Sequence, residues 1–202
     1  MKVDCLLAGV GGQGTVLASK IIAQTAMNSQ SFVRTSETIG MAQRGGCVVS
    51  HVRTDAKHCS SAIPKGMADL IIGFEPAEVV RNMEFLKPKG RILVNINPII
   101  PVTASLEEVS YKVEDIVKFL RDIRNQVVFV DGRKLCQIAG SPKVLNVIML
   151  GVAIKEQLLP FSKEEMLHTI QEILPQKLIE QNKTALEVGY CFEKYHHDKE
   201  AL

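Results

Sequence analysis

The chain of 202 residues contains no tryptophan, and aromatic residues make up only 5% of it. Proteins that bind single-stranded nucleic acid stack the bases on aromatic side chains, so this scarcity counts against such a role. Charge of neither sign dominates, because 24 basic side chains stand against 22 acidic ones and the formal net charge is +2. A nearly neutral chain lacks the excess of cations on which affinity for nucleic acid depends. We therefore expect no nucleic-acid partner.

Long hydrophobic runs and closely spaced cysteines are also missing. No apolar run reaches the roughly 20 residues that a membrane-spanning helix needs. The first four residues lead directly into a strand-like run, so we expect neither a signal peptide nor a membrane partner. No two cysteines have the spacing of a zinc site, a redox motif or an iron–sulfur cluster. The sequence thus favours a cytoplasmic chain with reduced thiols and no metal site of its own. The cysteines are Cys5, Cys47, Cys59, Cys136 and Cys191.

Short apolar runs that are typical of buried strands alternate with segments of helical periodicity. The apolar runs lie at residues 3–8, 70–74, 91–95 and 127–130. Two further strands are expected over residues 32–36 and over residues 47–53, where apolar and polar residues partly alternate. Helices are expected over residues 15–27, from Pro76, and around residues 116–123. In the last of these, Ile116, Phe119, Leu120 and Ile123 are spaced to share one face. The alternation predicts an α/β fold: a three-layer α/β/α sandwich with a largely parallel, Rossmann-like sheet.

Beyond Asp131 the pattern becomes helical. Residues 144–159 are apolar on nearly every side, which is typical of a buried helix. Ser162 and Glu165 have the spacing of a capping box and predict a helix that ends before Pro175. A last helix is expected over about residues 176–195. Without any internal repeat or linker, the sequence predicts one domain over residues 1–202, with a helical C-terminal part at about 132–196.

The glycine-rich segment Gly9-Val10-Gly11-Gly12-Gln13-Gly14 lies directly after the first strand and before the first helix. It contains the G-x-G-x-x-G pattern in the strand–turn–helix context that a dinucleotide site needs. Glycines let the backbone approach a ligand closely, and the start of a helix offers N–H groups to an anion. No Gly-Lys-Ser/Thr follows, so the segment is not an ATP-binding P-loop. The alternative is a tight turn without a ligand.

A second unusual segment joins two predicted strands at residues 37–46. Arg44, followed by two glycines, can present its planar guanidinium to a phosphate or a carboxylate. Glu37 lies 23 residues after Gly14, near the place where a nicotinamide-binding acid reaches a ribose hydroxyl; a cap or a salt bridge is the alternative. Neither segment supplies a general base or a nucleophile, so no catalytic residue is expected. The candidate binding residues are Gly9, Gly11, Gly12, Gln13, Gly14, Glu37, Gln43, Arg44 and Gly45.

Four other polar or reactive side chains are open to a simpler interpretation. We expect Cys47 to be a buried thiol within a strand and His51 to be a packed or hydrogen-bonded strand residue. Glu75 and Glu78 flank Pro76 at a strand–helix junction, where helix capping and contact with a partner are both open.

Together these segments resemble the gamma-type subunit or domain of the 2-oxoacid:ferredoxin oxidoreductases, most closely the beta subunit of indolepyruvate:ferredoxin oxidoreductase. The resemblance is carried by the glycine turn and the Arg44 segment. It continues through Ser50-His51-Val52-Arg53 and Gly73-Phe74-Glu75-Pro76 to Asn146 and Gly189. It therefore covers nearly the whole chain in order.

The resemblance implies a role that composition alone does not indicate. Such enzymes decarboxylate a 2-oxoacid on thiamine diphosphate, pass electrons through iron–sulfur clusters to ferredoxin, and release an acyl-CoA. It implies that this chain is a non-catalytic partner of a large subunit that carries the thiamine diphosphate and the clusters. The chain is then expected to complete the active site and to help bind coenzyme A. A stand-alone nicotinamide-dependent reductase and a scaffold subunit without a ligand remain open as alternatives.

Overall fold

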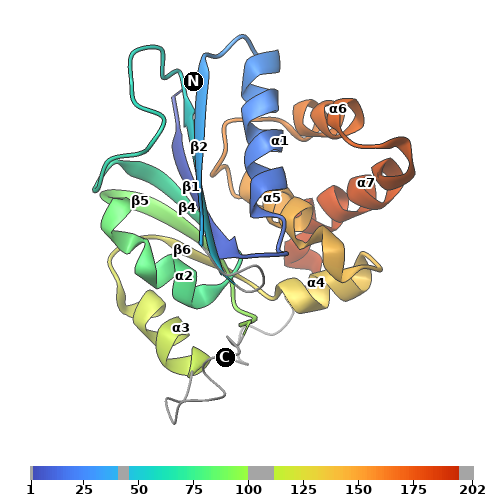
Figure 1. The fold of residues 1–202 in the computed structure, drawn as a ribbon. Coiled ribbons are helices and arrows are strands. Elements are labelled where there is room, and N and C mark those ends of the chain that lie inside the picture. The colour runs from blue at the N-terminus through green and yellow to red at the C-terminus, as the bar shows by residue number, and fades with distance from the viewer. Residues whose placement is uncertain (1, 41–45, 100–111, 196–202) are drawn as a thin grey trace.

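The computed structural model describes residues 2–40, 46–99 and 112–195 (Figure 1). The strands are β1 (Asp4–Val10), β2 (Val33–Ile39), β3 (Cys47–Thr54), β4 (Ala68–Gly73), β5 (Leu86–Asn95) and β6 (Val127–Val130). The α-helices are α1 (Thr15–Asn28), α2 (Pro76–Arg81), α3 (Val113–Asp122), α4 (Gly132–Ile138), α5 (Leu145–Lys155), α6 (Lys163–Ile173) and α7 (Gln176–Tyr190). Short 3₁₀ helices lie at Met83–Phe85, Pro142–Val144 and Phe192–Tyr195.

The six strands form one mixed sheet in the order β2-β3-β1-β4-β5-β6. The pairs β1–β4, β4–β5 and β5–β6 are parallel, whereas β3 pairs antiparallel with both β1 and β2. The prediction of a largely parallel sheet therefore holds for β1, β4, β5 and β6, which are neighbours in the sheet. The connection between β2 and β3 is only residues 40–46, which is too short for the crossover that parallel neighbours need. These two strands consequently form a hairpin that extends the sheet beyond β1.

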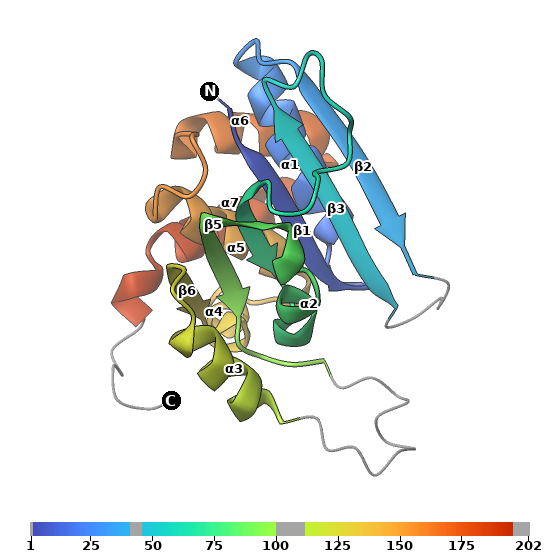
Figure 2. The same cartoon turned by 90° about the vertical axis from the view of Figure 1, so that its left-hand side faces the viewer.

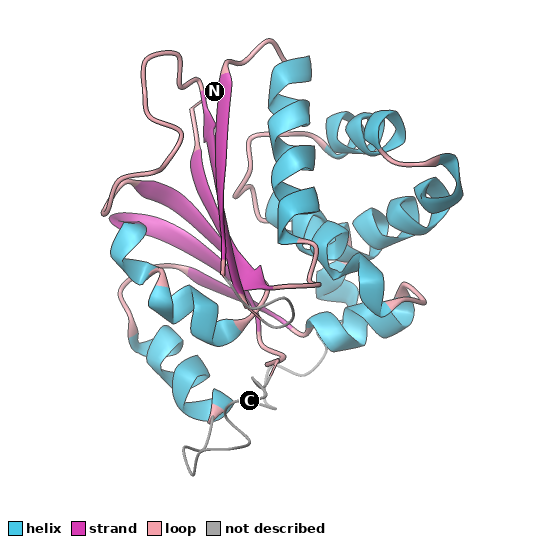
Figure 3. Ribbon diagram, in the orientation of Figure 1, coloured by secondary structure: helices cyan, strands magenta, loops and turns pink. Residues whose placement is uncertain are grey.

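Helices cover both faces of the sheet, so the predicted three-layer sandwich is confirmed (Figures 1 and 3). Helices α2 and α3 lie on one face, and α1 with α4 to α7 lies on the other. Each face has its own cluster of buried apolar side chains, and the larger cluster lies under α1 and α5. The helical C-terminal part begins with α4, close to the predicted residue 132, and packs on α1 and the sheet.

Helix α5 is buried at every position from Asn146 to Ile154, as its apolar sequence predicts. It lies in backbone contact with α7. A Cβ atom on Gly151 would lie 2.4 Å from the carbonyl oxygen of Leu186, and one on Gly189 would lie 2.1 Å from that of Ile148. Real Cβ atoms essentially never approach so closely, so these two glycines permit the crossing of the two helices.

Most predicted helix boundaries are confirmed, including the capping box that opens α6. Ser162 Oγ accepts from the Glu165 N–H at 3.1 Å, and the Glu165 carboxylate accepts from the Ser162 N–H at 2.7 Å. The predicted buried face of α3 is wrong in one position, because Phe119 is 48% exposed. Leu120 is buried as predicted, whereas Val117 is buried although it was not part of the predicted face, so the inward face of α3 is rotated from the predicted one.

Within the described ranges no single helix is long and apolar enough to cross a membrane. Only α4 and residues 142–155 together meet that length, as a pair bent by 118°.

Candidate ligand site at the carboxyl edge of the sheet

The glycine turn between β1 and α1 has a backbone conformation that requires glycine. Gly12 and Gly14 have φ angles of +96° and +78°, in the left-handed region that side chains disfavour. A Cβ atom on Gly14 would lie 2.7 Å from the side-chain nitrogen of Asn146 on α5. At Gly12, by contrast, nothing lies within 4 Å of the corresponding position. The turn is therefore closed toward α5 at Gly14 and open at Gly12.

Two hydrogen bonds connect the turn to its neighbours. The Gln13 side chain accepts from the Val10 N–H at 2.8 Å and donates to the Phe74 carbonyl at 2.8 Å. Gln13 therefore braces the turn against the end of β4, a structural role that the sequence did not indicate. The Gly11 N–H donates to the Gly46 carbonyl at 2.9 Å, which brings together the two segments singled out from the sequence. Gln43, Arg44 and Gly45 themselves lie outside the described residues.

Three helices start directly after strands at this edge of the sheet, and side chains cap two of them. On α2, the Glu75 carboxylate accepts from the Glu78 N–H at 3.0 Å, which confirms capping. On α4, Asp131 accepts from the Lys134 N–H at 3.1 Å. Helix α1 differs, since its N-cap is Gly14 and no side chain of the described residues caps it. Of the three, α1 therefore offers its first N–H groups to a ligand.

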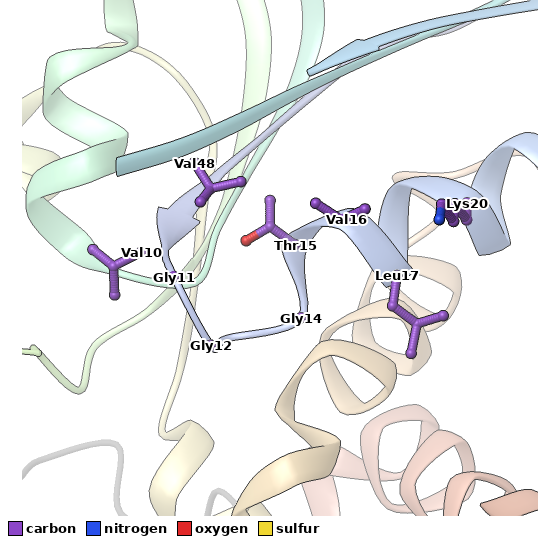
Figure 4. Close-up of a pocket in the computed structure, with 9 residues that line it drawn as sticks. All are labelled: Val10, Gly11, Gly12, Gly14, Thr15, Val16, Leu17, Lys20 and Val48. Atoms are coloured by element: carbon purple, nitrogen blue, oxygen red, sulfur yellow. The ribbon is translucent and has the colours of Figure 1, made fainter. Parts of the chain in front are cut away.

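A buried hydroxyl at the start of α1 also lacks a partner. Thr15 is 2% exposed, and its Oγ1 has no hydrogen bond within the described part of the chain. Buried polar atoms are rarely left unpaired, so such an atom needs an explanation. Figure 4 shows Thr15 beside the space between the glycine turn and Val48, with its hydroxyl turned toward the end of β1, where a Cβ atom on Gly9 would lie 3.0 Å from it. That space is a cavity of about 420 Å³, which Gly12 and the cation Lys20 also line.

A larger cavity of about 820 Å³ adjoins the other side of the turn. It shares Gly11 and Gly12 with the first cavity and extends past the end of β5 to the start of α4. Asn95 shapes its floor, since its side chain accepts from the Gly132 N–H at 3.0 Å and donates to the Phe74 carbonyl at 3.0 Å. Arg133 supplies a cation. This is the crevice beyond the carboxyl ends of parallel strands, where ligands of open α/β sheets bind.

Comparison with protein families identifies the chain. The family model described as pyruvate ferredoxin/flavodoxin oxidoreductase matches residues 4–192. The chain belongs to this family. The match includes the glycine turn, the whole sheet and the C-terminal helices.

Curated members of the pyruvate ferredoxin/flavodoxin oxidoreductase family match the chain over nearly its full length. Indolepyruvate oxidoreductase subunit IorB of Archaeoglobus fulgidus is 36% identical over 191 residues, covering 94% of each chain. The protein of the same name from Thermococcus kodakarensis is 33% identical over 190 residues, covering 93% of this chain and 94% of the relative. The resemblance seen in the sequence is thereby confirmed, and the family member described here is IorB-like, with relatives that are oxidoreductase subunits.

Solved structures share the fold of this family member. A keto/oxoacid ferredoxin oxidoreductase gamma subunit from Geobacter sulfurreducens superposes with a TM-score of 0.69 at 22% identity, covering 93% of this chain and 96% of that one. The 2-oxoglutarate:ferredoxin oxidoreductase of Magnetococcus marinus, solved with 2-oxoglutarate, coenzyme A and succinyl-CoA, gives a TM-score of 0.69 at 16% identity. The match covers 96% of this chain but 31% of that longer one.

Glu37 lies away from the glycine turn of this family member. It is exposed on β2 and accepts a hydrogen bond from the Ser19 hydroxyl of α1 at 3.3 Å. Strand β3 separates β2 from β1, whereas in nicotinamide-binding folds the strand that carries the ribose-binding acid lies next to the first strand. Glu37 lines neither cavity. The geometry therefore does not favour the nicotinamide interpretation.

His51 is a packed strand residue, as predicted. Its Nδ1 accepts from the Ile63 N–H at 3.2 Å, and its ring lies edge-on to Phe85 with the centroids 5.7 Å apart. Burial, with a smaller contribution from the nearby charge of Arg53, lowers the pKa of His51. The prediction for Cys47 is wrong in one respect. It is in a strand, but it is the first residue of β3, at the end of the sheet, and its side chain is exposed.

Several residues of the larger cavity were not predicted from the sequence. Asn95 ends β5 and Asn97 follows it, whereas Arg133 lies just after β6, so they are separated along the chain and meet only at the sheet edge. A polar side chain at the end of each predicted strand was the signal that could have found them. No group of three His, Cys, Asp or Glu side chains in the described residues is placed to hold a metal ion.

Proposed function

We propose that this chain is the non-catalytic small subunit of an indolepyruvate-type 2-oxoacid:ferredoxin oxidoreductase. It binds coenzyme A together with a large partner subunit and completes the active site of that subunit. The names of the relatives support the reaction class and the arylpyruvate substrate. One structural observation carries the role in ligand binding: the uncapped start of α1 lines a cavity beside the glycine turn, and the Thr15 hydroxyl there has no partner among the described residues.

The residues at this edge fit a phosphorylated ligand such as coenzyme A. The first N–H groups of α1, the Thr15 hydroxyl and Lys20 are the donors and the cation that a phosphate group attracts. Gly11 and Gly12 let the ligand approach the backbone, and Arg133 lines the adjoining cavity as a second cation. When bound, coenzyme A supplies the thiol that accepts the acyl group. We propose that Gln43, Arg44 and Gly45 contribute to the same site.

The residues of this chain do not fit an iron–sulfur cluster. The five cysteines lie on separate elements, and cluster ligands have to be thiolates. Burial raises the pKa of Cys5, and it raises that of Cys136 to about 11, so both thiols are held protonated. We therefore assign the clusters, the thiamine diphosphate and the transfer of electrons to ferredoxin to the large subunit. We also propose that the complex works in the cytoplasm, where thiols remain reduced.

The proposal is tested by reconstitution. The chain is purified alone, and the large partner subunit from the same organism is purified with and without the chain. We expect indolepyruvate-dependent reduction of ferredoxin, with coenzyme A as acceptor, only when both subunits are present. Turnover by the chain alone, or unchanged turnover of the large subunit without it, contradicts the proposal. Quenching of NADH fluorescence by the isolated chain would instead favour a nicotinamide-dependent reductase.

The role in coenzyme A binding is tested separately. A ligand that binds only the native state raises the melting temperature of the protein. We expect coenzyme A to raise the melting temperature of the complex. A complex that is active but is not stabilised by coenzyme A identifies the chain as a scaffold without a ligand.

A further inference from the structure

A third cavity, of about 550 Å³, lies at the opposite edge of the sheet, where the parallel strands begin. It opens between the starts of β1 and β4, an early part of β5 and the turn after α5. Its lining residues are Lys2, Val3, Asp69, Lys89, Arg91, Gln157, Leu158, Leu159 and Pro160. Nothing in the proposed role in coenzyme A binding uses this edge of the molecule.

The charge of this amino-edge cavity is positive. Within the described residues, none of the cations Lys2, Lys89 and Arg91 forms a salt bridge with a carboxylate. Asp69 is the one acid among the lining residues, and both of its oxygens are occupied. One accepts from the Asp4 N–H at 2.9 Å, and the other pairs with Lys87. The three cations are thus left to attract an anion from outside the chain.

One of these cations is already fixed in position. The Arg91 guanidinium donates through Nη2 to the Gln157 carbonyl at 2.8 Å, which leaves its other N–H groups for a ligand. Gln157 has a φ angle of +52°, a left-handed conformation that costs energy for a residue other than glycine. The turn therefore holds that carbonyl toward Arg91 at some conformational cost. A cation that is ordered before binding loses less entropy when the ligand arrives.

An apolar wall stands beside the cations. Leu158 and Leu159 line the cavity but belong mostly to the core, each being only 3% exposed, and the half-buried Pro160 offers most of the apolar surface to a ligand. The volume of the cavity lies within the range of about 300–1,000 Å³ that is usual for small-molecule sites. Clustered cations recognise phosphate groups, and an apolar wall accepts a flat ring or a sugar face. The combination is that of a site for a phosphate chain joined to an apolar group.

We propose that the amino-edge cavity binds a small phosphorylated ligand of the nucleoside diphosphate class. Arg91, Lys89 and Lys2 hold the phosphates, and Leu158 to Pro160 contact the base or the ribose. The site lies at the other end of the strands from the glycine turn, so it binds its ligand independently of coenzyme A.

Calorimetric titration of the full-length chain with ADP, and separately with pyrophosphate, tests the proposal. Because ADP could also enter the glycine-turn site, variants assign the binding. We expect Lys89→Glu and Arg91→Gln each to raise the Kd for ADP at least about tenfold, the effect of losing one charge-assisted hydrogen bond. The matched control Lys57→Gln, an exposed lysine outside the cavity, is expected to leave the Kd unchanged. Lys89 is exposed, so its variant folds even if that of Arg91 does not.

The possible outcomes distinguish binding at the amino-edge cavity from binding at the glycine turn. Weaker binding of pyrophosphate than of ADP, with both lost in Lys89→Glu, supports the phosphate and apolar contacts together. Absence of ADP binding overturns the proposal, and so does a Kd that changes equally in Lys57→Gln. Loss of ADP binding in Arg133→Gln but not in Lys89→Glu places the nucleotide at the glycine turn and also overturns it. Coenzyme A binding is expected to be unchanged in Lys89→Glu, so failure here leaves the proposed function intact.

Discussion

At the scale of single residues, the candidate site depends on polar atoms that the fold itself leaves unused. Most polar side chains around the glycine turn are occupied: Gln13 braces the turn, Asn95 connects β4 with α4, and Glu75 caps α2. The Thr15 hydroxyl is the exception among the described residues that line the smaller cavity. An unpaired buried group destabilises the free protein, and a ligand that pairs with it removes this cost.

Replacement of Thr15 by valine separates stability from binding. Thr15→Val removes an unpartnered hydroxyl, so we expect the free energy of unfolding of the chain to stay constant or rise by up to about 1 kcal/mol. The affinity of the complex for coenzyme A is expected to fall about tenfold, because a hydrogen bond to a charged group is lost. Urea titration and calorimetry measure the two quantities.

Thr25→Val is the matched control for that variant. Thr25 is also buried on α1, but its hydroxyl donates to the Ile21 carbonyl at 2.8 Å and bonds Thr169 at 3.0 Å. This variant is expected to lose about 1 kcal/mol of stability and no affinity for coenzyme A. A Thr15→Val chain destabilised as much as the control, or a complex with unchanged affinity, rejects Thr15 as a ligand-binding residue.

His51 makes the stability of the chain depend on pH. Its pKa is lowered in the folded state, so the unfolded chain binds the proton more readily. The neutral ring thus contributes stability above the unfolded pKa of about 6.5, and this stability is lost as the pH falls below that value toward the folded pKa. We expect the free energy of unfolding, measured by urea titration between about pH 5.5 and about pH 8, to fall on the acid side with a slope of at most about 1.4 kcal/mol per pH unit.

His51→Gln is the variant that checks this assignment. Glutamine keeps an oxygen that can accept from the Ile63 N–H but does not titrate. The acid-side slope is therefore expected to decrease in the variant. Parallel pH profiles of the two proteins would assign the acid sensitivity to other groups.

At the scale of elements, the crossing of α5 and α7 shows how small residues set helix positions. Gly189 lies against the Ile148 carbonyl, so no side chain fits between the two backbones there. In an isolated helix, replacing glycine by alanine stabilises by about 1 kcal/mol. At the crossing of α5 and α7 the same replacement is expected to destabilise the protein, because the added methyl group forces the helices apart.

We expect Gly189→Ala to destabilise the chain by about 3 kcal/mol or more, the upper range for overpacking a core. Thr184→Ala on the exposed side of α7 is the control, and it is expected to change the stability by less than about 0.5 kcal/mol. Chemical denaturation followed by circular dichroism measures both. A Gly189→Ala chain that is as stable as the original would show that the helices can separate without loss.

At the scale of the whole molecule, the sequence predicts where strands and helices lie better than it predicts which of them are neighbours in the fold. Apolar runs locate β1, β4, β5 and β6, because strands buried in a parallel sheet leave a continuous hydrophobic signature, although β5 runs longer than predicted. Strand β2 is half-exposed and polar, and it also runs longer than predicted. That β3 lies between β2 and β1 is a property of strand pairing, which no local pattern records. The exposure of Phe119 and Cys47 has the same origin, since it depends on which neighbour covers each element.

The candidate site likewise has one part that the sequence predicts and one part that it does not. The glycine turn could be predicted because its positive φ angles restrict the choice of residue and its motif is contiguous. The larger cavity could not, because Asn95 and Arg133 come from different strand ends and combine with the turn only after the sheet has formed. Figure 2, in which the ends of the strands are viewed from a second direction, shows how β1 and β5 bring these segments to one edge.

The hydrogen bond from the Gly11 N–H to the Gly46 carbonyl has a thermodynamic consequence. It connects the ligand-side turn to the start of β3, the inner strand of the hairpin that forms one end of the sheet, so a displacement of either is transmitted to the other. If a second subunit docks on that hairpin, occupancy of the turn and assembly of the complex become linked equilibria. Linkage is reciprocal, so the factor by which assembly tightens the ligand equals the factor by which the ligand tightens assembly.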